Sequence, residues 1–160
     1  MKAPQAASIR VDYTYYDLSN KSQQDCLSFI AGLAQDKSIH GIIVQMPIHD
    51  WYDPQMLLNI IPVEKDVDGL SDQSLLNLQN NEAKILPATP LAILELLKRS
   101  DVELQDKTVT LVGQGKLVGL PLSFILRNMG IKVLTADATT VNLAELTRQA
   151  DVIVLSLIHI

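Results

Sequence analysis

Residues 108–121, T-V-T-L-V-G-Q-G-K-L-V-G-L-P, constrain the fold of this chain more than any other segment. A β-branched run gives way to three glycines, Gly113, Gly115 and Gly119, and then continues as an apolar pattern typical of a helix. Glycine has no Cβ, so the backbone can turn sharply and lie close to a ligand, while the first N–H groups of the helix favour an anion. The segment therefore predicts a strand, a tight turn and a helix that bind phosphate groups.

A second strand pattern at residues 131–136, with Asp137 at its end, strengthens this prediction. In doubly wound α/β domains such a turn holds the pyrophosphate of a dinucleotide, and an acidic residue further on bonds the adenosine ribose. The spacing here is G-x-G-x-x-x-G, one residue longer than the common fingerprint, and a glycine-rich turn by itself is weakly specific. An ordinary βαβ unit without a ligand is the alternative to a Rossmann-like nucleotide-binding domain.

The overall charge limits the classes of partner. The chain has 160 residues, a net charge of −5, 48% hydrophobic residues and one cysteine. Nucleic acids and anionic membranes attract basic surfaces, so we expect neither as a partner. No segment approaches the roughly 18 apolar residues of a membrane span, and the first residues lack a signal-peptide pattern. Cys26 lies in a helical apolar pattern and predicts a small core residue, which suits a reducing cytoplasm.

The first half of the chain also alternates between helix and strand patterns. Residues 22–35 predict an amphipathic helix, and residues 39–46 form a near-continuous apolar run that predicts a strand covered on both faces. Asp53 followed by Pro54 is a good start for a helix over residues 54–61. These elements, with those of the second half, indicate an α/β fold with a parallel sheet in at least the second half.

A charged turn, E-K-D-V-D-G, occupies residues 64–69. Gly69 can adopt a positive φ, and the four ionisable side chains around it are compatible with either a solvated loop or a binding site.

The next segment is the best candidate for a crossing between domains. Residues 71–84 are polar and weakly patterned, and P-A-T-P at residues 87–90 then starts a strong helix over residues 91–99. The flanking prolines stiffen this start, where Thr89 can cap the helix or present its hydroxyl to a ligand.

Four short sequence motifs, called words below, resemble in identity and order those of the bifunctional methylenetetrahydrofolate dehydrogenase/cyclohydrolase family. They are G-I-I-V-Q-M-P at 41–47, P-V-E-K-D-V-D-G at 62–69, P-A-T-P at 87–90 and V-G-Q-G-K-L-V-G-L-P at 112–121. The resemblance implies a partial N-terminal α/β catalytic domain over residues 1–84. It also implies a partial Rossmann-like NAD(P)-binding domain over residues 85–160, with a folate cleft between the two.

The resemblance also implies roles for individual residues. Gln45 matches the glutamine that is the polar partner of the catalytic lysine and, with Pro47, belongs to the substrate side of the cleft. Asp68 matches the aspartate that holds the pterin ring, and a carboxylate that accepts two parallel donors makes a strong, oriented contact. The residues on the cofactor side are Gly113, Gln114, Gly115, Lys116, Gly119, Asp137 and Thr89.

The implied reaction is the oxidation of 5,10-methylenetetrahydrofolate to 5,10-methenyltetrahydrofolate with NAD(P)+, followed by hydrolysis to 10-formyltetrahydrofolate. This chemistry belongs to one-carbon metabolism and supplies purine biosynthesis. The resemblance further implies a cytoplasmic homodimer. No metal is expected, because His40 and His49 lack the spacing of metal ligands.

Two departures from the family pattern affect the catalytic prediction. The family's Y-x-x-x-K word is not intact, so the catalytic lysine corresponds either to Lys2 or to a position before Met1, and we expect little or no cyclohydrolase activity. Residues 157–160, which include His159, are unlike the family. We therefore expect a fragment truncated at both ends, and His159 is not a site candidate.

The cofactor prediction keeps two alternatives open. Asp137 and Gln114 stand where the family often has groups that suit the 2′-phosphate of NADP, and Asp137 would repel that phosphate. NADP stays the expected cofactor as the family default, because Lys116 or Lys132 can supply the positive charge for its 2′-phosphate, and NAD is the close alternative.

Two other functions stay open at this point. The chain can be a non-catalytic folate- or nucleotide-binding remnant, which agrees with the missing lysine word. It can also be a dehydrogenase of another small metabolite, although that hypothesis does not account for the words at 44–47 and 66–69.

Overall fold

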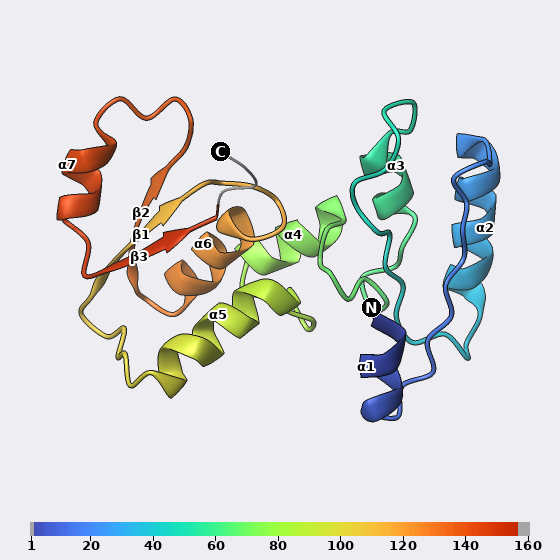
Figure 1. Cartoon of the computed structure of the whole chain (residues 1–160), viewed down its shortest axis with the longest axis horizontal. Coiled ribbons are helices and arrows are strands. Elements are labelled where there is room, and N and C mark those ends of the chain that lie inside the picture. The colour runs from blue at the N-terminus through green and yellow to red at the C-terminus, as the bar shows by residue number, and fades with distance from the viewer. Residues whose placement is uncertain (1, 157–160) are drawn as a thin grey trace.

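The computed structural model of the chain describes residues 2–156, and for residues 2 and 3 it describes the backbone alone. The elements, in chain order, are α1 (Lys2–Ser8), α2 (Gln23–Gln35), α3 (Pro54–Asn59), α4 (Asp72–Gln79), α5 (Ala88–Arg99), β1 (Thr108–Val112), α6 (Gly119–Asn128), β2 (Lys132–Ala136), α7 (Leu143–Arg148) and β3 (Val152–Leu155). The elements gather into an N-terminal lobe, residues 2–70, and a C-terminal lobe, residues 85–156, with α4 between them (Figure 1). Residues 157–160, and with them His159, lie outside the described residues.

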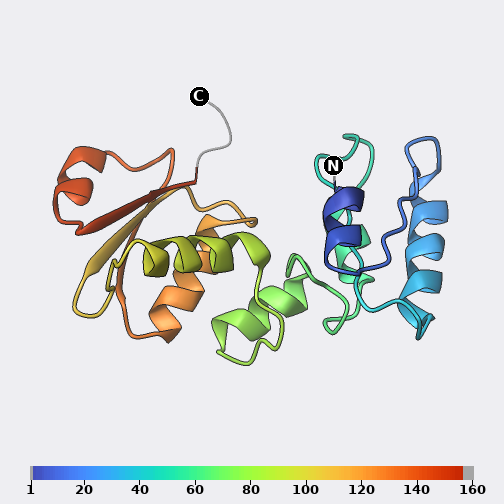
Figure 2. The same ribbon diagram turned by 60° about the horizontal axis from the view of Figure 1, so that its bottom comes forward.

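The C-terminal lobe is built on a parallel three-stranded sheet in the order β2-β1-β3. Helices α5 and α6 lie along one side of this sheet, and α7 lies on the other side (Figures 1 and 2). Val109 and Leu111 of β1 pack against Leu122 and Leu126 of α6, since residues two apart on a strand share a face. The strand, turn, helix and strand that the sequence predicts over residues 108–136 are confirmed.

Helix α2 has the N-terminus that its sequence predicts. The Ser22 side chain accepts from the Asp25 N–H, and the Asp25 side chain accepts from the Ser22 N–H, which together form a capping box. The helix buries Cys26 and Ile30 in a core that includes Ile42 and Leu57. Cys26 is only 3% exposed, so its predicted place in the core is confirmed.

The end of α2 is fixed by Lys65. Its Nζ donates to the carbonyl oxygens of Ala34 at 2.6 Å and Asp36 at 2.7 Å. Positive charge at the last carbonyls of a helix is favourable because these groups lack partners within the helix and carry partial negative charge. Lys65 therefore joins the charged turn to α2.

The predicted strand over residues 39–46 is wrong as a regular strand. In the described chain this segment makes a single parallel bridge, between Ile42 and Asp66, in which the Ile42 N–H donates to the Lys65 carbonyl at 2.8 Å. The reason is the neighbour: residues 62–69 fold into a tight turn, with the Lys65 N–H bonded to the Pro62 carbonyl. An extended run forms a strand only where its neighbour stays extended beside it.

The segment 71–84 contains a helix that its weak pattern did not predict. Ser71 caps α4 by accepting from the Ser74 N–H, and the helix buries Ser74, Leu75 and Leu78. Helix α4 packs on α3 of the N-terminal lobe and on α6 of the C-terminal lobe. The prediction that this segment crosses between the two halves agrees with its place between the lobes (Figure 2). None of the helices in residues 2–156 is long and apolar enough to cross a membrane.

Candidate functional site at the junction of the two lobes

The glycine-rich turn brings two of its glycines into direct contact. A Cβ added to Gly119 would lie 1.8 Å from the carbonyl oxygen of Gly113, far inside any normal contact. Gly113 has a φ of 100°, and its N–H donates to the Ala136 carbonyl at 2.8 Å. Both positions thus require glycine: Gly119 because of its close packing, and Gly113 because of its positive φ.

The turn leaves space where a ligand is expected. Gly115 is exposed, and an added Cβ there would meet no atom within 4 Å. Helix α6 then begins at Gly119 after Val118, without a side-chain cap. The N-terminus of a helix offers N–H groups and a positive dipole end to an anion. The residues present therefore fit the pyrophosphate of a dinucleotide.

Asp137 lies at the carboxyl end of β2, beside Gly113, because Ala136 is the partner of the Gly113 N–H. Its Oδ1 accepts from the Thr139 hydroxyl at 2.7 Å and from the Thr139 N–H at 2.9 Å. These bonds, and a weaker one from Thr140, lower the pKa of Asp137 below its usual value of 3.8. The carboxylate is ionised at neutral pH, which suits a ribose hydroxyl and opposes a 2′-phosphate.

The charged turn has a buried anchor that sequence reasoning missed. Asp66 is 2% exposed and accepts from the N–H groups of Gly69, Leu70 and Ser71 at 3.0, 3.3 and 2.9 Å. Thus the turn is more than a solvated loop. An aspartate three residues before a glycine with positive φ is the signal that could have revealed this anchor.

Asp68 is held at the point where three of the sequence words meet. It is half-buried, and its neighbour Gly69 has a φ of 66°, with an added Cβ 2.9 Å from Pro87 Cγ. On the other side, an added Cβ at Gly41 would lie 2.7 Å from Val67 Cγ1. The turn is therefore packed between the segments that begin at Gly41 and Pro87.

Gln45 and Pro47 follow the Gly41 segment and are exposed. The Gln45 Nε2 donates to the Met46 carbonyl at 2.8 Å, and the Met46–Pro47 peptide is cis. Within the described residues, the Gln45 side chain thus donates a hydrogen bond to the backbone of the next residue.

Thr89 does not cap helix α5. The N-cap position is Pro87, which makes no side-chain cap bond, and Thr89 is exposed in the first turn. The cap alternative is wrong because the helix begins one residue before Thr89, at Ala88. Lys2 is the first residue of α1, and its side chain lies outside the described part of the chain.

Lys116 reaches from the glycine-rich turn to the other lobe. Its Nζ donates to Oε1 of Gln55, on α3, at 2.8 Å. Gln114, the neighbouring candidate, is half-buried and donates to the Gly113 carbonyl at 3.1 Å. The sequence contains no signal that pairs Gln55 with Lys116, because 61 positions separate them.

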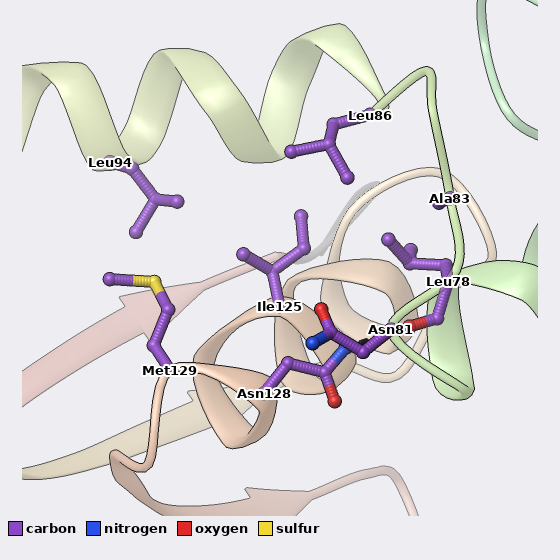
Figure 3. A pocket seen from close by; sticks show the side chains of 8 residues that line it. All are labelled: Leu78, Asn81, Ala83, Leu86, Leu94, Ile125, Asn128 and Met129. Atoms are coloured by element: carbon purple, nitrogen blue, oxygen red, sulfur yellow. Dashed lines mark hydrogen bonds between the residues drawn. The ribbon is translucent and has the colours of Figure 1, made fainter.

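A hollow of about 240 Å³ lies at the C-terminal end of α6. Figure 3 shows the side chains that line it. It is lined by Leu78, Asn81, Ala83, Leu86, Leu94, Ile125, Asn128 and Met129. None of the predicted site residues is among them. In residues 2–156, no three or more His, Cys, Asp or Glu side chains are grouped so as to hold a metal ion.

Two domain profiles of one family match the chain on either side of this junction. The catalytic domain of tetrahydrofolate dehydrogenase/cyclohydrolase matches residues 1–68, and its NAD(P)-binding domain matches residues 87–158. The chain belongs to this family. The recognition made from the four words is confirmed, as is the α/β fold class with a catalytic and an NAD(P)-binding part.

Similar proteins carry the same assignment. The bifunctional protein FolD of Lactococcus lactis is 34% identical over 157 residues, which is 98% of this chain and 55% of the relative. FolD 2 of Lactobacillus johnsonii is 38% identical over 136 residues, 85% of this chain and 48% of the relative. The chain spans about half the length of the curated relatives it matches.

Solved structures of the family have the same arrangement. The bifunctional FolD enzyme of Campylobacter jejuni has a TM-score of 0.92 and 34% identity, covering 97% of this chain and 56% of that one. The Trypanosoma brucei enzyme, solved with NADP and an inhibitor, has a TM-score of 0.89 and 29% identity, covering 97% of this chain and 54% of that one.

Proposed function

We propose that this chain provides the folate- and dinucleotide-binding junction of a methylenetetrahydrofolate dehydrogenase/cyclohydrolase. The observation that carries the proposal is the packing of the charged turn. Gly41 against Val67, and Gly69 against Pro87, bring three separate words together around Asp68. A non-catalytic remnant and a dehydrogenase of another metabolite have no comparable support.

On the folate side, we propose that Asp68 accepts from the amino and ring N–H groups of the pterin. Asp66 supports this role by holding the backbone on which Asp68 stands. Gln45 and Pro47 are proposed to border the same substrate. The Gln45 amide would give up its local bond to Met46 in order to hold a water or an ammonium group without adding charge.

On the dinucleotide side, we propose that Gly113, Gly115 and Gly119 let the backbone approach the pyrophosphate. Gln114, Lys116 and the exposed Thr89 complete the proposed set, with Asp137 toward the ribose. A dinucleotide held by these residues would supply the hydride acceptor for oxidation of the methylene carbon of the folate. The contribution of the chain to this step is mainly positioning.

The dinucleotide is proposed to be NADP, the family default, with NAD as the alternative that the charge of Asp137 favours. The proposed division into a catalytic part, 1–84, and a nucleotide-binding part, 85–160, agrees with the two profile matches, which end at 68 and start at 87.

Hydrolysis of the methenyl cation needs a proton-transfer group, which is a lysine in this family. Lys2 is the candidate within the chain. Without the intact Y-x-x-x-K word, we propose that the 160-residue chain has little cyclohydrolase activity.

The proposed setting is the cytoplasm, because the single cysteine is buried and has no second cysteine in the sequence to pair with. A homodimer and a role in purine biosynthesis are proposed from the family alone.

Binding measurements on the 160-residue chain test the proposal. We expect calorimetric titration to detect both a tetrahydrofolate derivative and NADP+ or NAD+, each weakened by its own set of substitutions. Formation of reduced nicotinamide from 5,10-methylenetetrahydrofolate would separate an enzyme from a remnant. A chain that binds dinucleotide but no tetrahydrofolate derivative contradicts the proposal.

A further inference from the structure

Gln55 is held so that only its oxygen faces the glycine-rich turn. Its backbone N–H is bonded to the Asp53 carboxylate that caps α3. Its Nε2 donates to the Asn59 side chain at 3.0 Å and to the Leu70 carbonyl at 3.3 Å. With both backbone and amide nitrogen fixed, the remaining group, Oε1, accepts from Lys116.

The same contacts continue to the start of α4. Asn59 Nδ2 donates to the Asp72 carboxylate at 2.8 Å, and Asn59 Oδ1 accepts from the Asp72 N–H at 2.9 Å. A row of side chains, Asp72, Asn59, Gln55 and Lys116, thus runs from the helix between the lobes to the glycine-rich turn. Lys116 is its only member from the C-terminal lobe.

The acceptor for Lys116 is neutral. Between residues 2 and 156 the ion pairs are Arg99 with Glu95 and Lys107 with Asp151, and Lys116 belongs to neither. A carboxylate in place of Gln55 would offset the positive charge, whereas an amide orients the ammonium group and leaves its charge for an anionic ligand.

We infer that Gln55, a residue of the N-terminal lobe, is a positioning residue that aims the Lys116 ammonium group at the phosphates of the dinucleotide. The inference rests on the proposed function and adds a specific residue to it. The lobe proposed to hold the folate thereby also orders the cationic part of the dinucleotide site, so the two ligands share one junction.

The test compares three variants of the whole chain with a control. Gln55→Met keeps the size of the side chain but removes the acceptor, Gln55→Glu keeps an acceptor but adds a negative charge, and Lys116→Met removes the cation. Gln73→Met is the matched control, because Gln73 is exposed and its side chain donates to Asn77 within its own helix.

Titration with NADP+ and NAD+ at several salt concentrations gives the main result. We expect Gln55→Met to weaken dinucleotide binding by about 3- to 10-fold, and Gln55→Glu by at least as much. The salt dependence of binding should fall in Gln55→Met and Lys116→Met alike, because an oriented cation no longer meets the phosphates. A fourth protein, which combines Gln55→Met with Lys116→Met, should match Lys116→Met alone.

Hydrogen exchange without ligand gives an independent measurement of the contact. Amides of residues 113–118 should exchange faster in Gln55→Met than in Gln73→Met, and Gln55→Glu should retain their protection. A purely structural role for Gln55 would speed exchange without changing the salt dependence of dinucleotide binding, and that result would overturn the inference.

Two other outcomes distinguish a failure of the proposed function from a failure of the inference about Gln55 alone. If the unaltered chain binds neither NADP+ nor NAD+, the proposed function fails and this inference fails with it. If the unaltered chain binds dinucleotide and Gln55→Met binds within about two-fold of it, only the inference about Gln55 fails.

Discussion

The α-carbon of Gly119 lies directly against the carbonyl oxygen of Gly113, so closely that a Cβ at position 119 would stand 1.8 Å from that oxygen. Because the obstacle is backbone, it cannot move aside as a flexible side chain could. This contact sets how near helix α6 begins to the end of strand β1.

Gly119→Ala should therefore destabilise the chain by at least about 1–3 kcal/mol, the usual cost of overpacking. Urea denaturation provides the measurement. Gly32→Ala is the matched control: Gly32 lies within α2, where an added Cβ meets nothing within 4 Å. The control should gain about 0.5–1 kcal/mol, because alanine restricts the unfolded chain and favours helix. Equal stability of the two variants would contradict the steric argument.

Asp66→Ala should cost about 3 kcal/mol, since three N–H groups of the turn lose a buried acceptor. Glu64→Ala, an exposed change in the same turn, should stay within about 0.5 kcal/mol of the unaltered chain. Chemical denaturation followed by circular dichroism compares the pair. A small effect at Asp66 would mean that the turn is held by something else.

Asp68→Asn should weaken binding of a tetrahydrofolate derivative by about tenfold or more. The substitution removes the negative charge and replaces one of the two acceptor oxygens proposed to face the pterin N–H groups by an NH₂ donor. Dinucleotide affinity should change little. Glu64→Gln removes one negative charge from the same turn and should leave both affinities unaltered. Equal folate affinity of Asp68→Asn and the unaltered chain would refute the assignment of Asp68.

Asp137→Ser should shift the preference of the chain toward NADP+ over NAD+. Bonds from Thr139, and more weakly from Thr140, keep the pKa of Asp137 low, so the carboxylate is charged at neutral pH and repels a 2′-phosphate. Parallel titrations with the two dinucleotides give the ratio. Glu103→Gln, which removes an exposed negative charge elsewhere, should not move the ratio. An unchanged ratio in Asp137→Ser would count against the ribose role.

Lowering the pH should reduce the stability of the C-terminal lobe partly by protonating Asp151. This carboxylate accepts from the Thr108 N–H at 2.8 Å, where β1 begins, and that bond, with the nearby Lys107 charge, lowers the pKa of Asp151 from 3.8. A folded-state pKa below the unfolded value means that the stability contributed by Asp151 is complete above the unfolded pKa. That contribution is lost as the pH falls through the lower, folded value.

Urea midpoints measured from about pH 6 down to about pH 2 test this sign. The unaltered chain should be more stable than Asp151→Asn above about pH 4, and the difference should shrink below it. A difference that grows toward low pH would contradict the assignment. Other aspartates with lowered pKa values, such as Asp25 and Asp36, titrate in both proteins and cancel in the comparison.

The sequence by itself determined the elements that depend on neighbouring residues. Helix α2 follows from its own cap and apolar spacing, and the β1–turn–α6 unit follows from its glycines, of which Gly113 needs its positive φ and Gly119 its missing Cβ. The four words also fixed the family. Local backbone preference and side-chain period are sufficient for this, because both act over a few residues.

Only the tertiary structure decided what depends on distant partners. The apolar run at 39–46 has the composition of a strand, yet within residues 2–156 it pairs only at Ile42, because its neighbour turns away. Helix α4 is weakly patterned and is stabilised by packing between α3 and α6. The hydrogen bond from Lys116 to Gln55 connects the two lobes between residues that lie 61 positions apart in the sequence. Such pairings are set by packing and loop closure in three dimensions, which the spacing of residues along the sequence does not encode.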